Sequence, residues 1–325
     1  MAAAEQIKSL IKSFSEGDDA RFYATAMQIA AAEARKGHEA LAKELKNLIQ
    51  ESKKSKINQG ILKKMPISSA QKELNDLLEF TRPDDKLKDM VLPKSLKMSI
   101  QRVLDEQRQI EKLRQHNLFP RKKILLTGPP GCGKTMTARV ISNELGIPLF
   151  IMRLDGLISR YMGESIAKLR LVFYTMKEFR AVYLFDEFDS IGTKRSQGNE
   201  VGEIKRVLNS FLLQIEKDYS NSLIIAATNM PESLDDALFR RFDDIISYPI
   251  PTEEEIYKYY KRELSSLKSI PENYFSELSK KSIGLNFSDL EKICHDYLKN
   301  IIVYGKEKSN LDFLFETIES RKRPF

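Results

Sequence analysis

The spacing of apolar residues predicts that the chain begins with a small bundle of helices. A first stripe recurs at i, i+3, i+4 and i+7, at Ile7, Leu10, Ile11 and Phe14. The sequence SEGDD then supplies a turn and an aspartate N-cap for a second helix, which starts near Asp19 and is broken at Gly37. A third stripe follows at Leu41, Leu45, Leu48 and Ile49. This pattern predicts a bundle over residues 1–60, either a solubilising appendage or a docking module for a partner.

The pattern changes after the bundle. Residues 61–93 are predicted as a linker, because a basic, serine-containing stretch with Pro66 as a breaker is followed only by a short helix and the polar sequence RPDDK. From about Leu92, helices alternate with short apolar runs such as KILLTG, AVYLFD and LIIAAT. Continuous apolar runs of this length are typical of strands covered on both faces in a parallel sheet. We therefore expect a doubly wound α/β core over residues 94–250.

The last part of the chain is predicted to be helical again. After the sequence YPIPTEEE the apolar spacing returns to that of helices, which indicates a helical lid subdomain over residues 251–325. Within it, SDLE at residues 288–291 has the form of a capping box that starts a helix.

Composition and charge fit a soluble globular protein. The chain is 42% hydrophobic and 30% charged, and no apolar run approaches the ~20 residues that a membrane helix needs. The polar N-terminus lacks an apolar signal core, and the two cysteines, Cys132 and Cys294, lie far apart; both features favour a cytoplasmic location without disulfides or a zinc site. The formal charge of +7 comes from 53 basic and 46 acidic residues spread along the chain, which argues against nucleic acid as a partner.

The strongest chemical signal is GPPGCGKT at residues 128–135, between the strand KILLT and the helix MTARVISNEL. It matches the P-loop pattern G-x-x-x-x-G-K-[ST] in the strand–loop–helix context that the pattern requires. The glycines let backbone N–H groups wrap a phosphate chain, Lys134 reaches the β- and γ-phosphates, and Thr135 binds Mg²⁺. The predicted nucleotide-binding residues here are Gly128, Pro129, Pro130, Gly131, Cys132, Gly133, Lys134, Thr135 and Met136.

Two acids follow another buried strand. The sequence VYLFDE places Asp186 and Glu187 at the end of that strand, where a lone buried carboxylate would be costly. Asp186 is expected to hold magnesium, mostly through water, and Glu187 to polarise the water that attacks the γ-phosphate. The alternative is a pair of unrelated acids that start a helix. Asp189 is expected to be a helix cap or a surface charge.

The third buried run, LIIAATN, ends at Asn229. Its amide could bond the attacking water or the γ-phosphate, and the alternative is a plain turn residue. The sequence LDDALFRRFDD follows, with Arg240 and Arg241 adjacent. Neighbouring arginines usually lie on the surface, but across a subunit boundary they would stabilise the charge of a transferring phosphoryl group.

Taken together and in this order, GPPGCGKT, LFDEFDSI, AATN and LDDALFRRFD resemble the AAA family of ring-forming ATPases, from about Leu92 to about Tyr304. The resemblance implies a P-loop NTPase fold, ATP and Mg²⁺ as cofactors, ATP hydrolysis, and a hexamer with ATP at each subunit interface. It implies that Asn229 is sensor 1, and that Arg240 and Arg241 are fingers reaching the neighbour's nucleotide. The sequence FRRFD is more similar to the corresponding sequence of microtubule-severing and membrane-remodelling members than to the RPGRFD of other members.

The sequence SRYMGES at residues 159–165 places two large side chains among polar residues. In the AAA family an aromatic–hydrophobic–glycine triplet lines the central pore, in the interval where Tyr161, Met162 and Gly163 stand. The resemblance therefore implies a pore loop that grips a polypeptide, since an aromatic ring and a thioether can contact many different side chains. The alternative is two apolar residues tucked under the loop.

The adenine pocket departs from the family pattern. The lid of the family usually carries a Gly-Ala or Gly-Ser pair near the base, whereas GLNFSDL here has Phe287 before Ser288. Phe287 either stacks on the base or fills the lid core. Leu92 and Gly284 are the expected edges of the pocket, and Ser288 is a further expected nucleotide contact.

The N-terminal segment FSEGDDARFYATAMQIAAAEARKGHEALAKEL is similar to stand-alone bacterial AAA ATPases encoded beside a subtilisin-like serine protease. Such pairs are suspected of maintaining mobile elements or of phage defence, so the resemblance implies a partner protease. The chain itself has neither a G-x-S-x-G elbow nor an HExxH motif, so any proteolysis would belong to the partner.

These features predict an ATP-driven remodeller of proteins that works as a ring-shaped homo-oligomer. One alternative is an ATP-gated switch that assembles and releases a partner without threading it, which would not need a pore triplet. The other is a DNA loader, which would require base-stacking aromatics and a coherent basic stripe.

Overall fold

The computed structural model describes residues 19–35, 37–39, 41–47, 49, 74, 76–153, 163–189, 200–265, 270–305 and 311–322. The chain divides into two compact units, Met1–Ser68 and Ser69–Phe325.

The N-terminal unit contains helix α2, Asp19–Arg35, as the sequence predicted. The chain turns at Gly37, which has a φ of 88°, and the amide of His38 donates to the carbonyl of Glu33. Residues 41–47 are helical again, in agreement with the predicted third helix. The predicted first stripe, at residues 7–14, lies outside the described residues.

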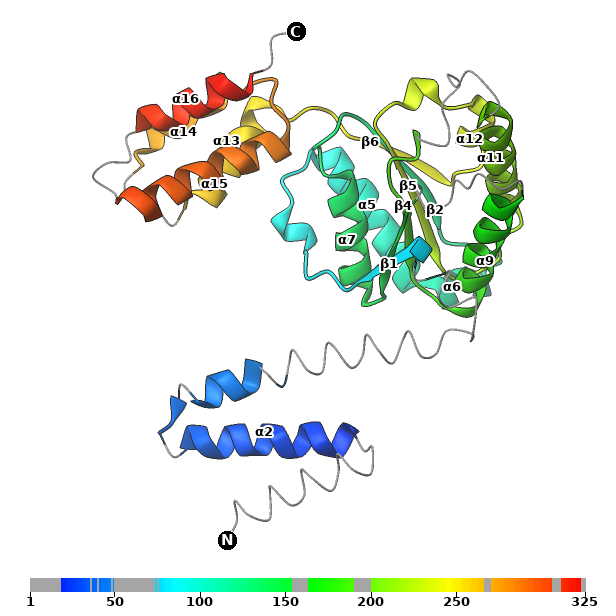
Figure 1. The fold of residues 1–325 in the computed structure, drawn as a ribbon, viewed down its shortest axis with the longest axis horizontal. Coiled ribbons are helices and arrows are strands. Elements are labelled where there is room, and N and C mark those ends of the chain that lie inside the picture. The colour runs from blue at the N-terminus through cyan, green and yellow to red at the C-terminus, as the bar shows by residue number, and fades with distance from the viewer. Residues whose placement is uncertain are drawn as a thin grey trace. The chain divides into compact units, whose positions relative to one another are not determined.

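The second unit is built on a six-stranded sheet with the order β1-β3-β4-β5-β2-β6 (Figure 1). Neighbouring strands run parallel, except that β1 pairs antiparallel with β3. Strands β4 and β5 are buried along their whole length, which accounts for their continuous apolar sequences. The predicted α/β fold is therefore confirmed. The strands are β1 (Leu78–Thr81), β2 (Lys123–Thr127), β3 (Leu149–Met152), β4 (Val182–Phe185), β5 (Leu223–Thr228) and β6 (Asp244–Ser247).

The edge strand β1 was not expected, because its four residues LEFT show no extended apolar pattern. Leu78 lies opposite Met152, and the ring of Phe80 meets that of Phe150 edge-on, with 5.4 Å between centroids. The strand lies within residues 61–93, the range predicted as a linker, so part of that range is hydrogen-bonded into the sheet. A short edge strand depends on contacts with distant residues, which a local pattern does not reveal.

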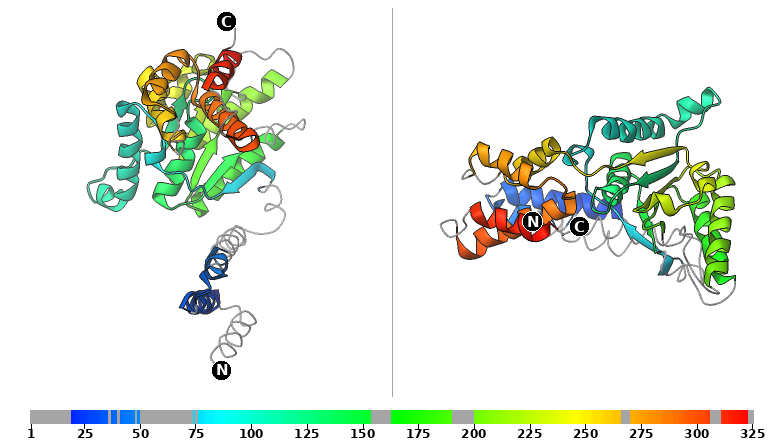
Figure 2. Two further views of the ribbon diagram at one scale, coloured as in Figure 1. Left: turned by 90° about the vertical axis from the view of Figure 1, so that its left-hand side faces the viewer. Right: turned by 90° about the horizontal axis from the view of Figure 1, so that it is seen from above.

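Helices cover both faces of the sheet (Figures 1 and 2). Helices α5 and α7 contact each other on one face, and α9 and α11 contact each other on the other. Helix α5 is held by one buried stripe, formed by Leu96, Ile100, Val103 and Leu104. The helical elements of this region are α5 (Lys94–Arg108), α6 (Ile110–Gln115), α7 (Lys134–Leu145), α9 (Glu164–Glu178), α11 (Glu200–Glu216), α12 (Asp236–Phe239), and the 3-10 turns η1 (Leu87–Asp89) and η2 (Pro231–Ser233).

The lid consists of four helices around an apolar core of their own: α13 (Glu253–Glu263), α14 (Glu272–Lys281), α15 (Phe287–Tyr304) and α16 (Leu311–Arg321). Helix α13 begins with a capping box formed by Thr252 and Glu255. The N-cap of helix α15 is Asn286, whose side chain accepts from the amide of Asp289 at 2.9 Å. The capping box predicted at residues 288–291 is therefore wrong, because the N-cap residue stands two positions earlier. Within the described residues, none of the helices combines the length and the apolar character that a membrane crossing needs.

Candidate functional site

A cavity of about 750 Å³ opens at the carboxyl ends of β2, β4 and β5, between the sheet and the lid. Its walls come from residues 89–92, the loop after β2 with the start of α7, the strand ends, and the lid helices α13 and α15. The predicted nucleotide-binding residues that line it are Leu92, Pro130, Gly131, Cys132, Gly133, Lys134, Thr135, Met136 and Ser288. The P-loop and the lid therefore line the same cavity.

The glycines of the P-loop are required by the path of its backbone. Gly128, Gly131 and Gly133 have φ values of 135°, 73° and 98°. A Cβ atom on Gly128 would lie 2.2 Å from the carbonyl oxygen of Tyr248, and one on Gly131 would lie 2.4 Å from the Oδ1 of Asn286. Gly133 is the N-cap residue of α7, so the first-turn amides of that helix border the cavity. Unpaired amides and the helix dipole make this end a binding site for anions.

Lys134 is buried, and its ammonium group bridges two strand ends. It donates to the carbonyls of Gly128 and Pro129, at 2.6 and 2.8 Å, and to the Oδ1 of Asn229 at 2.7 Å. Desolvation lowers the pKa of Lys134, while the nearby carboxylates of Asp186 and Asp189 act in the opposite direction. Three neutral oxygens thus hold a positive charge at the cavity wall, where phosphate oxygens could take their place.

Thr135 and Asp186 meet beside this lysine. The hydroxyl of Thr135 donates to the Oδ2 of Asp186 at 2.6 Å. Hydroxyl and carboxylate oxygens suit Mg²⁺, which usually keeps few protein ligands and completes its shell with water and phosphate. The described residues contain no cluster of three or more His, Cys, Asp or Glu side chains that could hold a metal. The oxygens of Thr135 and Asp186 are therefore the donor set here that fits Mg²⁺.

Glu187 stands in a strained turn directly after β4. It has a φ of 50°, an exposed side chain that lines the cavity, and an amide that donates to the Oδ1 of Asp186. Such a conformation costs about 1–3 kcal/mol and persists only where the surroundings impose it. Phe188 supplies that constraint: its amide donates to the carbonyl of Ala227 at 2.8 Å, and its buried ring packs on Phe211. The turn therefore holds Glu187 at the cavity.

Asp189 has a role that the sequence did not predict. Its Oδ1 accepts from the hydroxyl of Thr228 at 3.0 Å and from the amide of Asn229 at 3.1 Å. The turn after β4 is thereby tied to the end of β5, and Asn229 is held from both sides, by Asp189 and by Lys134. The partners lie about forty positions apart in the sequence, so only the repeated acid in DEFD could have signalled this contact.

The two adjacent arginines have different surroundings. Arg241 donates to the carbonyl of Ala237 at 2.6 Å, and its Nε lies 3.7 Å from a carboxylate oxygen of Glu216. Arg240 is exposed, and its guanidinium forms no hydrogen bond or ion pair with the described part of the chain. Neither arginine lines the cavity. They are therefore placed outside the site of their own chain.

Phe287 and Leu92 both line the cavity. The ring of Phe287 lies 5.6 Å from that of Tyr259, between centroids, and also packs against the apolar core of the lid. The ring thus borders both the cavity and the core, the two positions that the sequence left open. Gly284 does not line the cavity; it has a φ of 94°, and a Cβ there would meet no atom within 4 Å.

The lid is joined directly to the P-loop. The amide of Ser288 donates to the carbonyl of Gly131 at 3.2 Å. On the same side, the guanidinium of Arg262 donates to the carbonyl of Asp89 and lies over the ring of Tyr259, 5.2 Å from its centroid. No motif marks Asp89, Tyr259 and Arg262, so the sequence did not predict these contacts.

Of the predicted pore residues, Tyr161 and Met162 lie outside the described residues. Gly163 is the N-cap residue of α9 and has a φ of 88°, with no atom within 4 Å of the position of a Cβ. The positive φ favours a glycine at this position, although a side chain would have room there.

Comparison with known proteins agrees with this arrangement. The sequence profile described as "ATPase family associated with various cellular activities (AAA)" matches residues 124–250. An uncharacterized AAA family ATPase from Sinorhizobium fredii is 33% identical over 310 residues, which cover 95% of this chain and 92% of that protein.

More distant relatives match only part of the chain. A katanin p60 ATPase-containing protein of the A-like 1 type, from Rattus norvegicus, is 33% identical over 187 residues, which cover 54% of this chain and 38% of the relative. A putative cell division cycle ATPase from Plasmodium falciparum is 36% identical over 180 residues, which cover 54% of this chain and 15% of that protein. On the P-loop geometry, the strand order and the full-length relative together, the chain belongs to the AAA family of ATPases.

Proposed function

We propose that the chain binds ATP and Mg²⁺ in the cavity, hydrolyses the ATP within a ring of identical chains, and uses the cycle to remodel or unfold a protein. The observation that supports this most directly is the Lys134 ammonium group, which joins the P-loop carbonyls to Asn229 beside Asp186 and Glu187.

Each residue of the site would have one task. Lys134 would exchange its carbonyl contacts for phosphate oxygens, so that its charge stays paired throughout. Thr135 and Asp186 would hold Mg²⁺, which neutralises the charge on the phosphates. Glu187 would accept a proton from the water whose oxygen attacks the γ-phosphorus while the bond to the β–γ bridging oxygen breaks. Asn229 would orient that water or the γ-phosphate.

The position of Arg240 supports a ring. An arginine that is exposed and lies outside its own cavity can stabilise a transferring phosphoryl group only in a second copy of the chain. Arg241, tied to Ala237 and Glu216, would shape the loop that presents Arg240. A head-to-tail contact of this kind forms a ring when the rotation between neighbours closes, and the resemblance implies closure at six copies.

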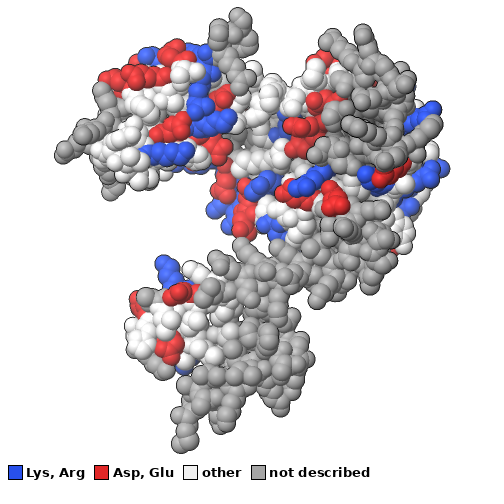
Figure 3. Space-filling view, viewed as in Figure 1, with Lys and Arg blue, Asp and Glu red and all other residues white. Residues whose placement is uncertain are grey.

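The expected substrate is a polypeptide. Two observations support a polypeptide substrate: the triplet Tyr161, Met162 and Gly163, and the similarity to a katanin p60 ATPase-containing protein. On the face shown in Figure 3, basic and acidic residues are interspersed over the sheet region and the lid and form no single basic stripe. That distribution favours protein over nucleic acid.

The N-terminal unit would dock a partner protein. Its resemblance to stand-alone bacterial members implies a subtilisin-like serine protease as that partner, in a toxin–antitoxin-like or phage-defence pair. Binding of the separate chains would test this part of the proposal.

Replacing Glu187 by Gln should leave ATP binding intact and slow hydrolysis by about 10²–10⁴-fold, since the amide keeps the size of the side chain but cannot accept the proton. Phosphate release and binding of a fluorescent ATP analogue measure the two effects. Glu178→Gln, on the exposed end of α9, is the matched control. Hydrolysis at the wild-type rate in Glu187→Gln would remove this residue from the mechanism.

Replacing Asp189 by Ala should reduce hydrolysis about tenfold or more, because Thr228 and Asn229 lose their shared acceptor and the amide of Asn229 is no longer held in place. Asp189→Asn keeps an Oδ1 acceptor, so it should recover most of the activity. Steady-state ATPase assays, with thermal unfolding as a check on folding, separate the variants. Equal losses in both would contradict the positioning role.

Replacing Tyr161 by Ala should preserve ATP hydrolysis and abolish unfolding of a tagged substrate protein, because the aromatic grip is lost while the nucleotide site is untouched. Tyr174→Ala, an exposed tyrosine of α9, should preserve both. Unfolded protein, and not single-stranded DNA, should stimulate hydrolysis by the unaltered chain. Normal unfolding by Tyr161→Ala would contradict threading and favour a binding switch.

A further inference from the structure

A second cavity, of about 530 Å³, lies at the opposite end of the sheet from the nucleotide site. It borders Lys123, the first residue of β2, whereas the P-loop follows the last residue of that strand, Thr127. Four strand steps of ~3.3 Å separate the two levels. The walls come from the end of α5, helix α6, the segment 119–123 and the loop 218–221 before β5. None of these residues lines the nucleotide cavity.

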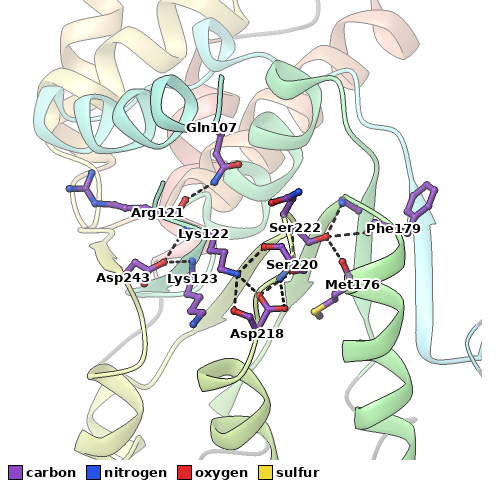
Figure 4. Close-up of polar contacts among 12 residues, drawn as sticks. Gln107, Arg121, Lys122, Lys123, Met176, Phe179, Asp218, Ser220, Ser222 and Asp243 are labelled. Atoms are coloured by element: carbon purple, nitrogen blue, oxygen red, sulfur yellow. Dashed lines mark hydrogen bonds and ion pairs between the residues drawn. The ribbon is translucent and has the colours of Figure 1, made fainter. Parts of the chain in front are cut away.

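One wall of this cavity is a fixed polar network (Figure 4). The ammonium group of Lys122 lies 2.7 Å from the Oδ2 of Asp218 and donates to the carbonyls of Asp218 and Ser220, each at 2.9 Å. The carboxylate of Asp218 is fully buried and also accepts from the amide and hydroxyl of Ser220. Because every one of these groups has a partner, the wall is preformed and its own polar groups are already used.

Two other polar groups of the cavity have no partner. Gln107 is 2% exposed; its Nε2 donates to the carbonyl of Arg121 at 2.8 Å, but its buried Oε1 accepts no hydrogen bond from the described residues. The ammonium group of the half-buried Lys123 forms no hydrogen bond or ion pair with the described part of the chain. A buried acceptor left unpaired costs about 1–3 kcal/mol. The Oε1 of Gln107 is shielded from solvent, so Lys123 is the group that a ligand can reach; no carboxylate of the described residues lies at ion-pair distance from it, and Asp243 and Asp218 act on it from further away.

Two aromatic side chains border the same cavity. Phe119 is 82% exposed and Tyr219 is 88% exposed, and they line the cavity from two different segments, 119–123 and 218–221. Folding gains almost nothing from aromatic side chains in this position. Exposed aromatic residues around a hollow are characteristic of protein-recognition surfaces, where they supply most of the binding energy.

We propose that this cavity binds a short segment of a partner protein in which an aromatic or large aliphatic side chain stands beside an Asp or Glu. The apolar side chain would lie against Phe119 and Tyr219, and the carboxylate would pair with Lys123. One peptide thus supplies both contacts.

The charges of the cavity favour a peptide over nucleic acid. Arg121 lies 2.7 Å from Glu106, Lys122 pairs with Asp218, and Arg114 bonds to the side chain of Asn221. Lys123 is the lining cation without such a partner among the described residues. A run of phosphates would need several unpaired cations, whereas a single acidic side chain needs one.

A displayed library of random short peptides, selected on the immobilised full-length chain, tests the proposal. We expect enrichment of sequences with an aromatic or large aliphatic residue next to an acidic residue. A synthetic peptide of the enriched sequence should then bind the chain in a fluorescence-polarisation titration. Binding should weaken about tenfold or more in the double variant Phe119→Ser, Tyr219→Ser and in Lys123→Met.

The controls separate this site from the nucleotide site. Tyr174→Ser removes another exposed tyrosine, from α9, and should leave peptide binding unchanged. Glu187→Gln should also bind the peptide normally, so a failure of the proposed ATPase mechanism would not affect this result. No enrichment of the pattern, equal binding by all variants, or selection of basic peptides would overturn the proposal, as would tighter binding of an oligonucleotide than of any selected peptide.

Discussion

The ammonium group of Lys134 is buried where the loop after β2 meets the end of β5, and the geometry of the nucleotide site follows from how this charge is stabilised. A buried cation without partners would be strongly unfavourable, so three oxygens from two different segments must stay within hydrogen-bonding distance. Asn229 is one of these partners, and Asp189 holds its amide from the other side. In the proposed ATP complex, phosphate oxygens would replace these contacts and Asn229 would be the side chain released. Lys134 would thus report the presence of the nucleotide to β5.

The lid contacts the P-loop directly, which makes it a second link between the cavity and the rest of the chain. A side chain at position 131 would clash with Asn286, the N-cap of α15, so the close contact between the P-loop and the lid requires Gly131. Ser288 and Arg262 add hydrogen bonds from the lid to the P-loop and to Asp89. A change in the P-loop would therefore act on helix α15 through direct contacts. In a ring, such displacement of the lid is the means by which hydrolysis could move neighbouring chains.

Sequence patterns predicted the parts of this protein that depend on local order. The P-loop, the acids after β4 and the buried strands β2, β4 and β5 are each contained in one short segment, so spacing and hydropathy identify them. Features formed by distant segments were missed. Strand β1 exists because it pairs with β3, and the role of Asp189 requires β5. The second cavity is lined by Phe119 and Tyr219, from two segments about a hundred positions apart, and neither segment carries a motif. The difference between Arg240 and Arg241 likewise depends on Glu216, on another helix.

The central claim is that Arg240 of one chain completes the site of another. Mixing two inactive variants, Arg240→Ala and Glu187→Gln, tests it most directly. Each alone should hydrolyse ATP very slowly. In a mixed ring, an Arg240→Ala chain keeps Glu187 and can receive Arg240 from a Glu187→Gln neighbour, so about a quarter of the interfaces regain both groups in an equal mixture. The account predicts that ATP hydrolysis rises well above that of either variant. A mixture no more active than the average of the two would contradict it.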